Sequence, residues 1–269
     1  MNTANQTLVN RDSNFKKAKN YILITLGISW LFGFIALEFV DNKSLPFMLT
    51  YAFLPSITAI IINKKEGGNW KSLMFIKPNF KSLLLATLIP ILYVGIGFYL
   101  QKLLNIRTAP EWNALGSTGK MILITVANFV SLLILVLGEE IGWRGYLQEK
   151  LINAFGEVKG IIILGIVWGL WHLPVALKGY NFENYTYFEA FVTYPIVCIA
   201  SSFIIAYLGH KRYAIFVGVF LHAANNSFNS IMLAITEVKN ELGFILLSTA
   251  IAFDLVLIFG YLYWRKTKK

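Results

Sequence analysis

The chain is dominated by long apolar stretches, each close to the length that crosses a lipid bilayer as a helix. A spanning helix needs about 20 mainly apolar residues. Eight stretches fit this pattern, near 21–40, 46–63, 83–101, 122–147, 160–178, 188–209, 214–236 and 243–264. Backbone polar groups inside lipid must bond within their own segment. The pattern therefore predicts an all-α fold, a polytopic transmembrane helix bundle of about eight spanning helices.

Composition supports a lipid environment. Hydrophobic residues make up 57% of the 269 residues and charged residues only 14%, whereas soluble domains have about 25% charged residues. The net charge of +10 comes from short basic clusters between the apolar stretches. This arrangement suits anionic lipid headgroups, so we expect the lipid bilayer as a partner and no nucleic acid. Nothing in the sequence indicates an oligomeric state.

The distribution of Lys and Arg predicts the orientation. Connections on the side of the two termini receive eighteen of these residues and the opposite side six. Basic connections remain cytoplasmic, so both termini are expected in the cytoplasm of a cell whose Lys-, Asn- and Ile-rich usage suggests a bacterium. We expect a polar, flexible N-terminal cytoplasmic tail over 1–20, one transmembrane domain over 21–264 and a basic C-terminal tail over 265–269.

Two acidic residues stand at the end of the fourth apolar stretch. Ionisable groups inside a bilayer are functional candidates by default. Glu140 and Arg144 are four residues apart and can pair on one helical face. Glu139 is rotated by about 100° from Glu140, has no such partner and is available for chemistry. Alternatively, the helix ends at Leu137 and both acids face water.

His172 lies late in the fifth apolar stretch. Gly165 and Gly169 form a small-residue face that allows another helix to approach closely. Pro174 is expected to kink the helix just beyond His172. A histidine that only bonds to a neighbouring helix is the structural alternative.

His222 and Asn226 are also four residues apart, so they point the same way from one helix. Two such hydrogen-bonding groups could hold a polarised oxygen, or they could serve only helix packing. The lone cysteine, Cys198, allows no disulfide within the chain and no cysteine-based metal site; we interpret it as a packing residue.

Helix geometry places the three candidates at a similar depth. If the fourth helix continues to Lys150, Glu139 lies 11 residues before that residue, His172 lies 13 residues after Lys159, and His222 lies 10 residues after Arg212. These separations are about 15–20 Å at 1.5 Å per residue. The three side chains are therefore predicted to share one slab inside the membrane, nearer the cytoplasmic face.

These motifs resemble those of the CAAX-protease and bacteriocin-processing family, also called CPBP or Abi. Glu139-Glu140 with Arg144, Trp168 with His172, and His222 with Asn226 follow that family's order of motifs. The resemblance covers residues 138–227, and Trp168 departs from it because the family commonly has Phe there. It implies an intramembrane endopeptidase that cuts a peptide or membrane-protein substrate, reached from the cytoplasmic side.

The resemblance also implies the roles of the residues. Glu139 is the general base, His172 helps to hold the water, and His222 and Asn226 donate to the oxyanion. Arg144 neutralises Glu140 as structural support. No cofactor is expected, although Glu139, His172 and His222 could instead supply three ligands of a catalytic zinc.

Two other functions remain open at this stage. The protein could provide self-immunity to a bacteriocin by binding a peptide without cutting it, or it could be a small transporter. The sequence shows no inverted repeat and no paired broken helices of the kind that transporters have. Whether protection survives Glu139→Ala would separate binding from cleavage. The identity of the substrate is not encoded in any motif.

Overall fold

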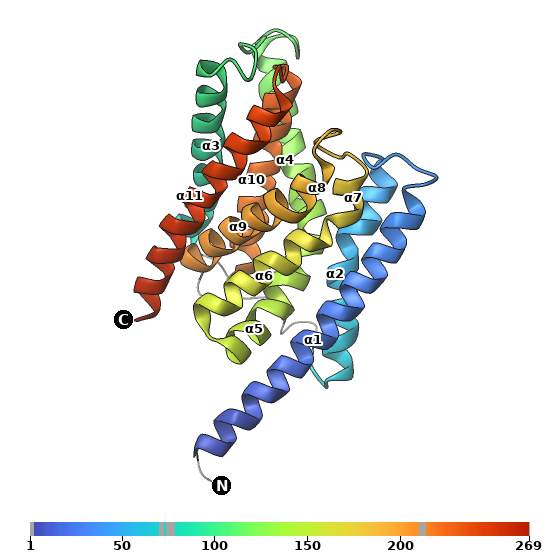
Figure 1. The fold of residues 1–269 in the computed structure, drawn as a ribbon, viewed down its shortest axis with the longest axis vertical. Helices are drawn as coiled ribbons and strands as arrows, with labels where there is room; N and C mark the ends of the chain where they lie inside the picture. The colour runs from blue at the N-terminus through green and yellow to red at the C-terminus, as the bar shows by residue number, and fades with distance from the viewer. Residues whose placement is uncertain (1–2, 70–72, 74–78, 210–213, 269) are drawn as a thin grey trace.

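The computed structural model describes residues 3–69, 73, 79–209 and 214–268, and within these ranges the chain is almost entirely helical (Figure 1). The elements are α1 (Thr3–Ala36), α2 (Leu45–Lys65), α3 (Phe80–Leu103), α4 (Thr118–Glu140), η2 (Ile141–Leu147), α5 (Gln148–Phe155), α6 (Glu157–Trp171), α7 (Leu173–Leu177), α8 (Thr186–Phe188), η3 (Glu189–Thr193), α9 (Tyr194–Leu208), α10 (Ala214–Ala234) and α11 (Glu241–Thr267). No sheet forms in the described ranges, and an isolated bridge joins Arg107 to Val238. The predicted all-α class is confirmed.

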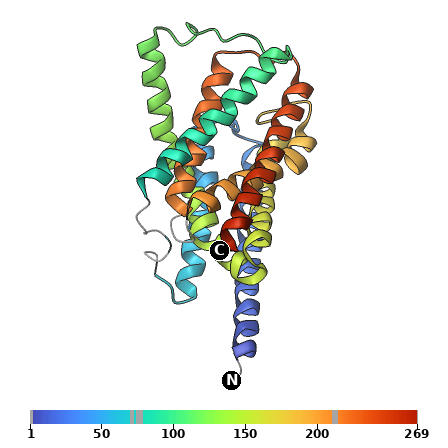
Figure 2. The ribbon, with the colours of Figure 1, turned by 90° about the vertical axis from the view of Figure 1, so that its left-hand side faces the viewer.

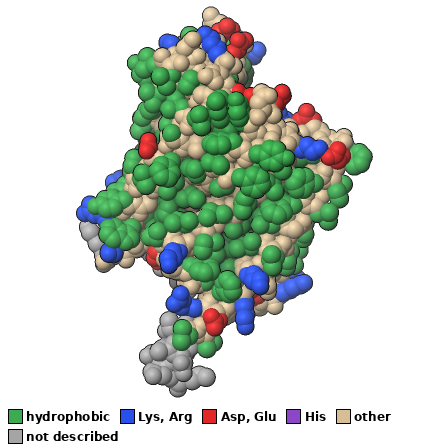
Figure 3. All heavy atoms as spheres, viewed as in Figure 1, with side chains coloured by type: hydrophobic (Ala, Val, Ile, Leu, Met, Phe, Trp, Pro, Cys, Tyr) green, Lys and Arg blue, Asp and Glu red, His purple; other side chains and the backbone are tan. Residues whose placement is uncertain are grey.

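Among the described residues, six segments are long and apolar enough to cross a membrane: Leu8–Ala36, Leu45–Lys65, Phe80–Leu103, Thr118–Phe155, Thr186–Leu208 and Glu241–Thr267. Figure 3 shows apolar side chains over the middle of one face, with charged side chains nearer its ends. This exposed apolar surface requires lipid as its solvent, and the protein is a polytopic helical membrane bundle. All eight predicted stretches are helical, but α6 has only 15 residues, so the number of crossings stays a prediction.

Helix α1 extends beyond its predicted start. We expected residues 1–20 to be a flexible tail, yet the helix begins at Thr3. No Gly or Pro occurs before Gly27, so nothing interrupts the helix once its apolar part is anchored.

Helix α4 passes without a break into η2 and α5, as far as Phe155. Glu139 is only 7% exposed and Glu140 is fully buried, so the alternative in which the helix ends at Leu137 is wrong. The segment η2 is π-helical, and such turns inside α-helices are frequent at functional sites.

Helices α6 and α9 approach each other through the predicted glycine face. A Cβ at Gly165 would lie 2.5 Å from the Cα of Ile199, and one at Gly169 would lie 2.5 Å from the Cα of Pro195. Helix α6 ends at Trp171 and α7 begins at Leu173 with Pro174 in its first turn. The chain therefore breaks at His172, where Pro174 was predicted to disturb it.

Helices alternate in direction, so the connections form two groups. The termini lie towards the lower end in Figure 1, and the connections 37–44, 104–117 and 178–185 lie towards the opposite end (Figures 1 and 2). Connection 235–240 belongs to this second group because the backbone amide of Thr108 donates to the carbonyl oxygen of Glu237 at 2.9 Å.

Candidate active site

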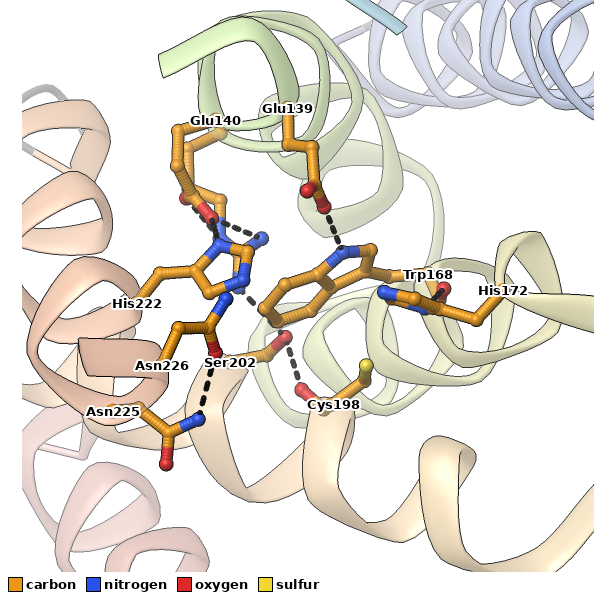
Figure 4. Close-up of polar contacts among 10 residues, drawn as sticks. Glu139, Glu140, Trp168, His172, Cys198, Ser202, His222, Asn225 and Asn226 are labelled. Carbon is orange, nitrogen blue, oxygen red and sulfur yellow. Dashed lines mark hydrogen bonds and ion pairs between the residues drawn. The ribbon is translucent and has the colours of Figure 1, made fainter. Parts of the chain in front are cut away.

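The motif residues from three separate helices line one cavity of about 1080 Å³. Glu139 comes from the last turn of α4, His172 from the break after α6, and His222 and Asn226 from α10. Figure 4 shows Glu139, His172 and His222 arranged around the indole ring of Trp168. The structure therefore brings together all four side chains that the sequence singled out for catalysis.

Glu140 and Arg144 form a buried ion pair beside the cavity. Arg144 Nε lies 3.2 Å from Glu140 Oε2, and both side chains are fully buried. Arg144 Nη1 donates to Glu140 Oε1 and Nη2 donates to Ser202 Oγ, each at 3.3 Å. A Cβ at Gly218 would collide with the Glu140 carboxylate, so this glycine on α10 makes room for the pair. The predicted pairing of Glu140 with Arg144 is present.

Glu139 is held by a single neighbour. Its Oε2 accepts a hydrogen bond from Trp168 Nε1 at 2.9 Å. No protein donor to its other oxygen is found among the residues that the structure describes, and this side chain lines the cavity. The guanidinium of Arg144 lies over the Trp168 ring, 4.2 Å from the centroid. Trp168 thus fixes one oxygen of Glu139 and leaves the other for a small molecule.

The hydrogen bond of His172 determines which ring nitrogen carries the proton. Nδ1 lies 2.9 Å from the backbone carbonyl oxygen of Trp168. Because a carbonyl oxygen only accepts, Nδ1 is the donor, and the neutral ring has an unprotonated Nε2. The ring stacks on Tyr194 with centroids 4.3 Å apart and an angle of 10°. His172 is therefore held in one orientation with an acceptor nitrogen available.

His222 and Asn226 occupy the α10 side of the cavity. Nδ1 of His222 lies 3.3 Å from Glu140 Oε1, and the ring meets Trp168 edge-on with centroids 5.2 Å apart. Nε2 of His222 has no hydrogen-bond partner among the described residues. Asn226 Oδ1 accepts from Asn225 Nδ2 at 3.1 Å, which leaves the Asn226 amino group as a donor.

A zinc site made by Glu139, His172 and His222 was the alternative considered from the sequence. Within the described ranges, no group of three His, Cys, Asp or Glu side chains has a geometry suited to a metal ion. Trp168 lies between the candidates, with its ring centroid 6.2 Å from that of His172 and 5.2 Å from that of His222. Cys198 is buried in the cavity wall, as expected of a packing residue.

The cavity extends from Glu139 towards the end of the bundle that lies away from the termini. Its lining includes residues from connections at that end: Asn42, Lys43, Arg107, Tyr180, Asn181, Phe182, Glu183, Asn184 and Val238. Towards the termini, two apolar clusters pack below the site; one contains Val217 and Leu221, and the other Ile141 and Ile215.

Three contacts in the site were not predicted from the sequence. Trp168 donates to Glu139, Tyr194 stacks on His172, and Ser202 accepts from Arg144. The replacement of Phe by Trp was noted in the sequence, but only as a change in packing. The N–H group that Trp has and Phe lacks could have indicated the hydrogen bond to Glu139. Tyr194 and Ser202 gave no signal, because nothing local distinguishes them from other helix residues.

The chain is similar to known CAAX proteases. The family model for Rce1-like proteins, described as type II CAAX prenyl endopeptidases, matches residues 121–228. The matched region contains Glu139, His172, His222 and Asn226. A protein named CAAX prenyl protease 2 from Methanococcus maripaludis is 28% identical over 237 residues, which is 81% of this chain and 86% of that protein. These matches indicate a CAAX-type intramembrane endopeptidase, and the chain is similar to proteins of the CAAX-protease (CPBP) family.

Proposed function

We propose that this endopeptidase hydrolyses a peptide bond with water activated by Glu139. The observation that carries the proposal is the pair of acceptors in one cavity, one oxygen of Glu139 and Nε2 of His172, for which the described residues provide no donor. A water molecule between them donates one hydrogen bond to each. Its oxygen lone pairs are then free to attack a carbonyl carbon, and the low-dielectric surroundings strengthen both bonds.

The opposite wall of the cavity supplies donors for the developing oxyanion. The Asn226 amino group is one donor. Nε2 of His222 is the second when the ring is protonated on both nitrogens, a form that retains the contact between Nδ1 and Glu140. Donors set in advance in a water-poor site are worth more than donors in water, and the loss of one typically costs about 100–1000-fold in rate.

The proton balance requires no further group. Glu139 takes a proton from the water while the water oxygen bonds to the carbonyl carbon. The carbonyl oxygen becomes the oxyanion. The oxyanion then collapses, the carbon–nitrogen bond breaks, and Glu139 returns the proton to the leaving amine. Arg144 balances the charge of Glu140, so that Glu139 is the carboxylate available for this transfer.

The side of the membrane from which the substrate reaches the site follows from the orientation of the protein and the lining of the cavity. We propose that both termini are cytoplasmic, because Lys and Arg gather on their side. The cavity then reaches the opposite, non-cytoplasmic side of the membrane, since its connection residues belong to that end. Access from the cytoplasm was expected from the sequence, and the cavity lining favours the other side.

The substrate is proposed as a peptide or the tail of a membrane protein. The Methanococcus relative is named for prenylated CAAX substrates, which makes a prenylated peptide one class to test. Bacteriocin-type peptides are a second class, suggested by the bacteriocin-processing branch of the family.

The direct test compares membrane proteomes of cells that contain the wild-type protein or Glu139→Gln. Fragments present only with the wild type identify the substrate. Purified Glu139→Gln should be folded and inserted, yet cleave the identified substrate at less than about one thousandth of the wild-type rate. The matched control is Glu149→Gln, on an exposed face of α5, which should retain activity. Full activity of Glu139→Gln would refute the role of this residue.

A zinc chelator tests whether protein groups, and not a bound metal, activate the water. Because the proposed chemistry uses carboxylate and imidazole acceptors, we expect the purified enzyme to keep its rate after chelation. Stoichiometric zinc that leaves together with activity would replace this mechanism with metal catalysis.

A further inference from the structure

Arg107 is a buried cation outside the site described above. It lies in the connection between α3 and α4, and its side chain is only 4% exposed. It lines the same cavity as Glu139, among the connection residues at the end away from the termini.

No carboxylate neutralises this cation. Among the residues that the structure describes, no Asp or Glu lies within ion-pair distance of Arg107, and its buried Nε has no hydrogen-bond partner. Its neighbours are aromatic: the guanidinium lies 4.7 Å from the ring centroid of Phe244 and 5.9 Å from that of Phe98. Burial lowers the pKa of Arg107 to about 10, so the group remains charged at neutral pH.

Hydrogen bonds on both sides of Arg107 hold the backbone of its segment in place. The Ile106 carbonyl oxygen accepts from the amides of Lys239 and Asn240, at 2.9 and 3.2 Å. The Thr108 amide donates to Glu237, and Thr108 Oγ1 accepts from the Glu237 amide, both at 2.9 Å. The connection before α4 is thus fastened to the one before α11 on both sides of Arg107.

A buried, unpaired cation is costly to the folded protein, because it loses hydration without gaining a partner. Aromatic rings offset only part of that cost. The planar guanidinium donates two parallel hydrogen bonds to a carboxylate better than to other groups. A buried arginine in the cavity wall, with no carboxylate partner among the described residues, is therefore suited to bind an anion that arrives with the substrate.

We propose that Arg107 binds a carboxylate of the peptide substrate at the outer end of the cavity. This subsite rests on the proposed peptidase function. Its ligand is either the C-terminal carboxylate or an acidic side chain of the peptide. The backbone of Arg107 forms an isolated bridge with Val238, just beyond the end of α10. His222 lies 12 residues before that end. That separation is about 18 Å along the helix, which an extended peptide spans in about five or six residues.

Binding to an inactive protein tests the subsite separately from cleavage. Full-length Glu139→Gln in nanodiscs is titrated with three dye-labelled pools of ten-residue peptides, whose positions are randomised among residues other than Asp and Glu. One pool has a free C-terminal carboxylate, one is amidated, and one is amidated with a glutamate at a fixed internal position. Fluorescence anisotropy measures binding, so the result does not depend on whether Glu139 is the base.

We expect at least one carboxylate pool to bind about tenfold more tightly than the amidated pool, and the better pool identifies the source of the carboxylate. This preference should disappear when Arg107→Gln is added and weaken with Arg107→Lys, which keeps the charge but loses the planar fork. Lys43→Gln is the matched control, because Lys43 is a second cation in the cavity lining; here the preference should persist.

Thermal unfolding separates a binding role from a structural one. Arg107→Gln removes an unpaired buried charge, so its Tm without peptide should equal or exceed that of the parent. Equal binding of the three pools, binding of none, or a preference that survives Arg107→Gln would each overturn the proposal. A clear fall in Tm would assign Arg107 to structure instead.

Discussion

Trp168 connects the groups of the site more directly than its position in the motif suggested. One edge of its indole donates to Glu139, its face carries the guanidinium of Arg144, and its backbone carbonyl accepts from His172. A phenylalanine would keep the ring and the carbonyl but lose the donor to Glu139. The orientation of the proposed base therefore depends on one N–H group.

Trp168→Phe should lower kcat by roughly 10- to 100-fold, because a hydrogen bond to a charged group is worth about 1.5–3 kcal/mol. KM should change less than about twofold, since the ring and the cavity wall remain. Steady-state kinetics on the substrate found by proteomics provides the measurement. Trp171→Phe is the control: Trp171 Nε1 has no hydrogen-bond partner in the part of the chain that the structure describes, so the same change there should leave kcat nearly unaltered. Equal effects of the two substitutions would contradict the role of the N–H group.

The ion pair of Glu140 with Arg144 should matter far more to stability than an exposed pair of similar geometry. Arg144→Met leaves a buried carboxylate without its partner, which should cost about 3–5 kcal/mol of unfolding free energy and abolish cleavage. Lys178→Met breaks the exposed pair with Glu38, at 2.6 Å, and should cost less than about 1 kcal/mol. Unfolding in detergent compares the two. Similar losses would show that burial of the first pair has no special effect.

At the scale of elements, irregular helices position the site. The π-helical turn η2 follows Glu139 and Glu140 directly, and the break between α6 and α7 falls at His172. A second π-helical segment, η3, precedes Tyr194, which stacks on His172. Each departure from regular α-helix lies beside a side chain of the proposed site, a placement that is common where backbone geometry serves function.

The close approach of α6 and α9 can be tested at one glycine. Gly169→Ala places a methyl group against the backbone of Pro195, which cannot move aside as a side chain can. We expect a loss of about 1–3 kcal/mol in unfolding free energy and lower activity, because His172 and Tyr194 belong to these two segments. Gly27→Ala is the control, since a Cβ there meets nothing within 4 Å; its stability should be unchanged or slightly higher. Tolerance of Gly169→Ala would show that the helices can separate at low cost.

At the scale of the whole molecule, the cavity extends from the site to connections at one end of the bundle. Connections that carry Asn, Glu and Arg side chains line it there, while apolar clusters pack on the side of the site towards the termini. The charge distribution and the cavity together predict a peptidase whose site is reached from the non-cytoplasmic side.

Cysteine labelling on intact cells tests this orientation. Cys198 is the only cysteine and is buried, so Cys198→Ala provides a background without accessible thiols. Glu183→Cys, in the exposed connection beside the cavity, should react with a membrane-impermeant maleimide on intact cells. Asp12→Cys, on the exposed surface of α1, should react only after permeabilisation. The reverse pattern would place the cavity opening in the cytoplasm.

The sequence by itself determined the class of protein and most of the proposed site. Apolar stretches of membrane length required helices, because lipid offers the backbone no other hydrogen-bond partners. Spacing of four residues paired Glu140 with Arg144 and aligned His222 with Asn226, since local helix geometry governs such neighbours. The break near His172 followed from Pro174, whose ring and missing N–H are local properties.

Only the tertiary structure decided how the helices meet. The hydrogen bond from Trp168 to Glu139, the stacking of Tyr194 on His172 and the contact of Ser202 with Arg144 join residues on different elements, and no periodicity within one helix encodes such contacts. The length of α1 and the continuation of α4 through a π-helical turn were also beyond the hydropathy pattern, which reports apolarity and not where a helix ends. The cavity and the unpaired Arg107 within it exist only once loops far apart in sequence lie side by side.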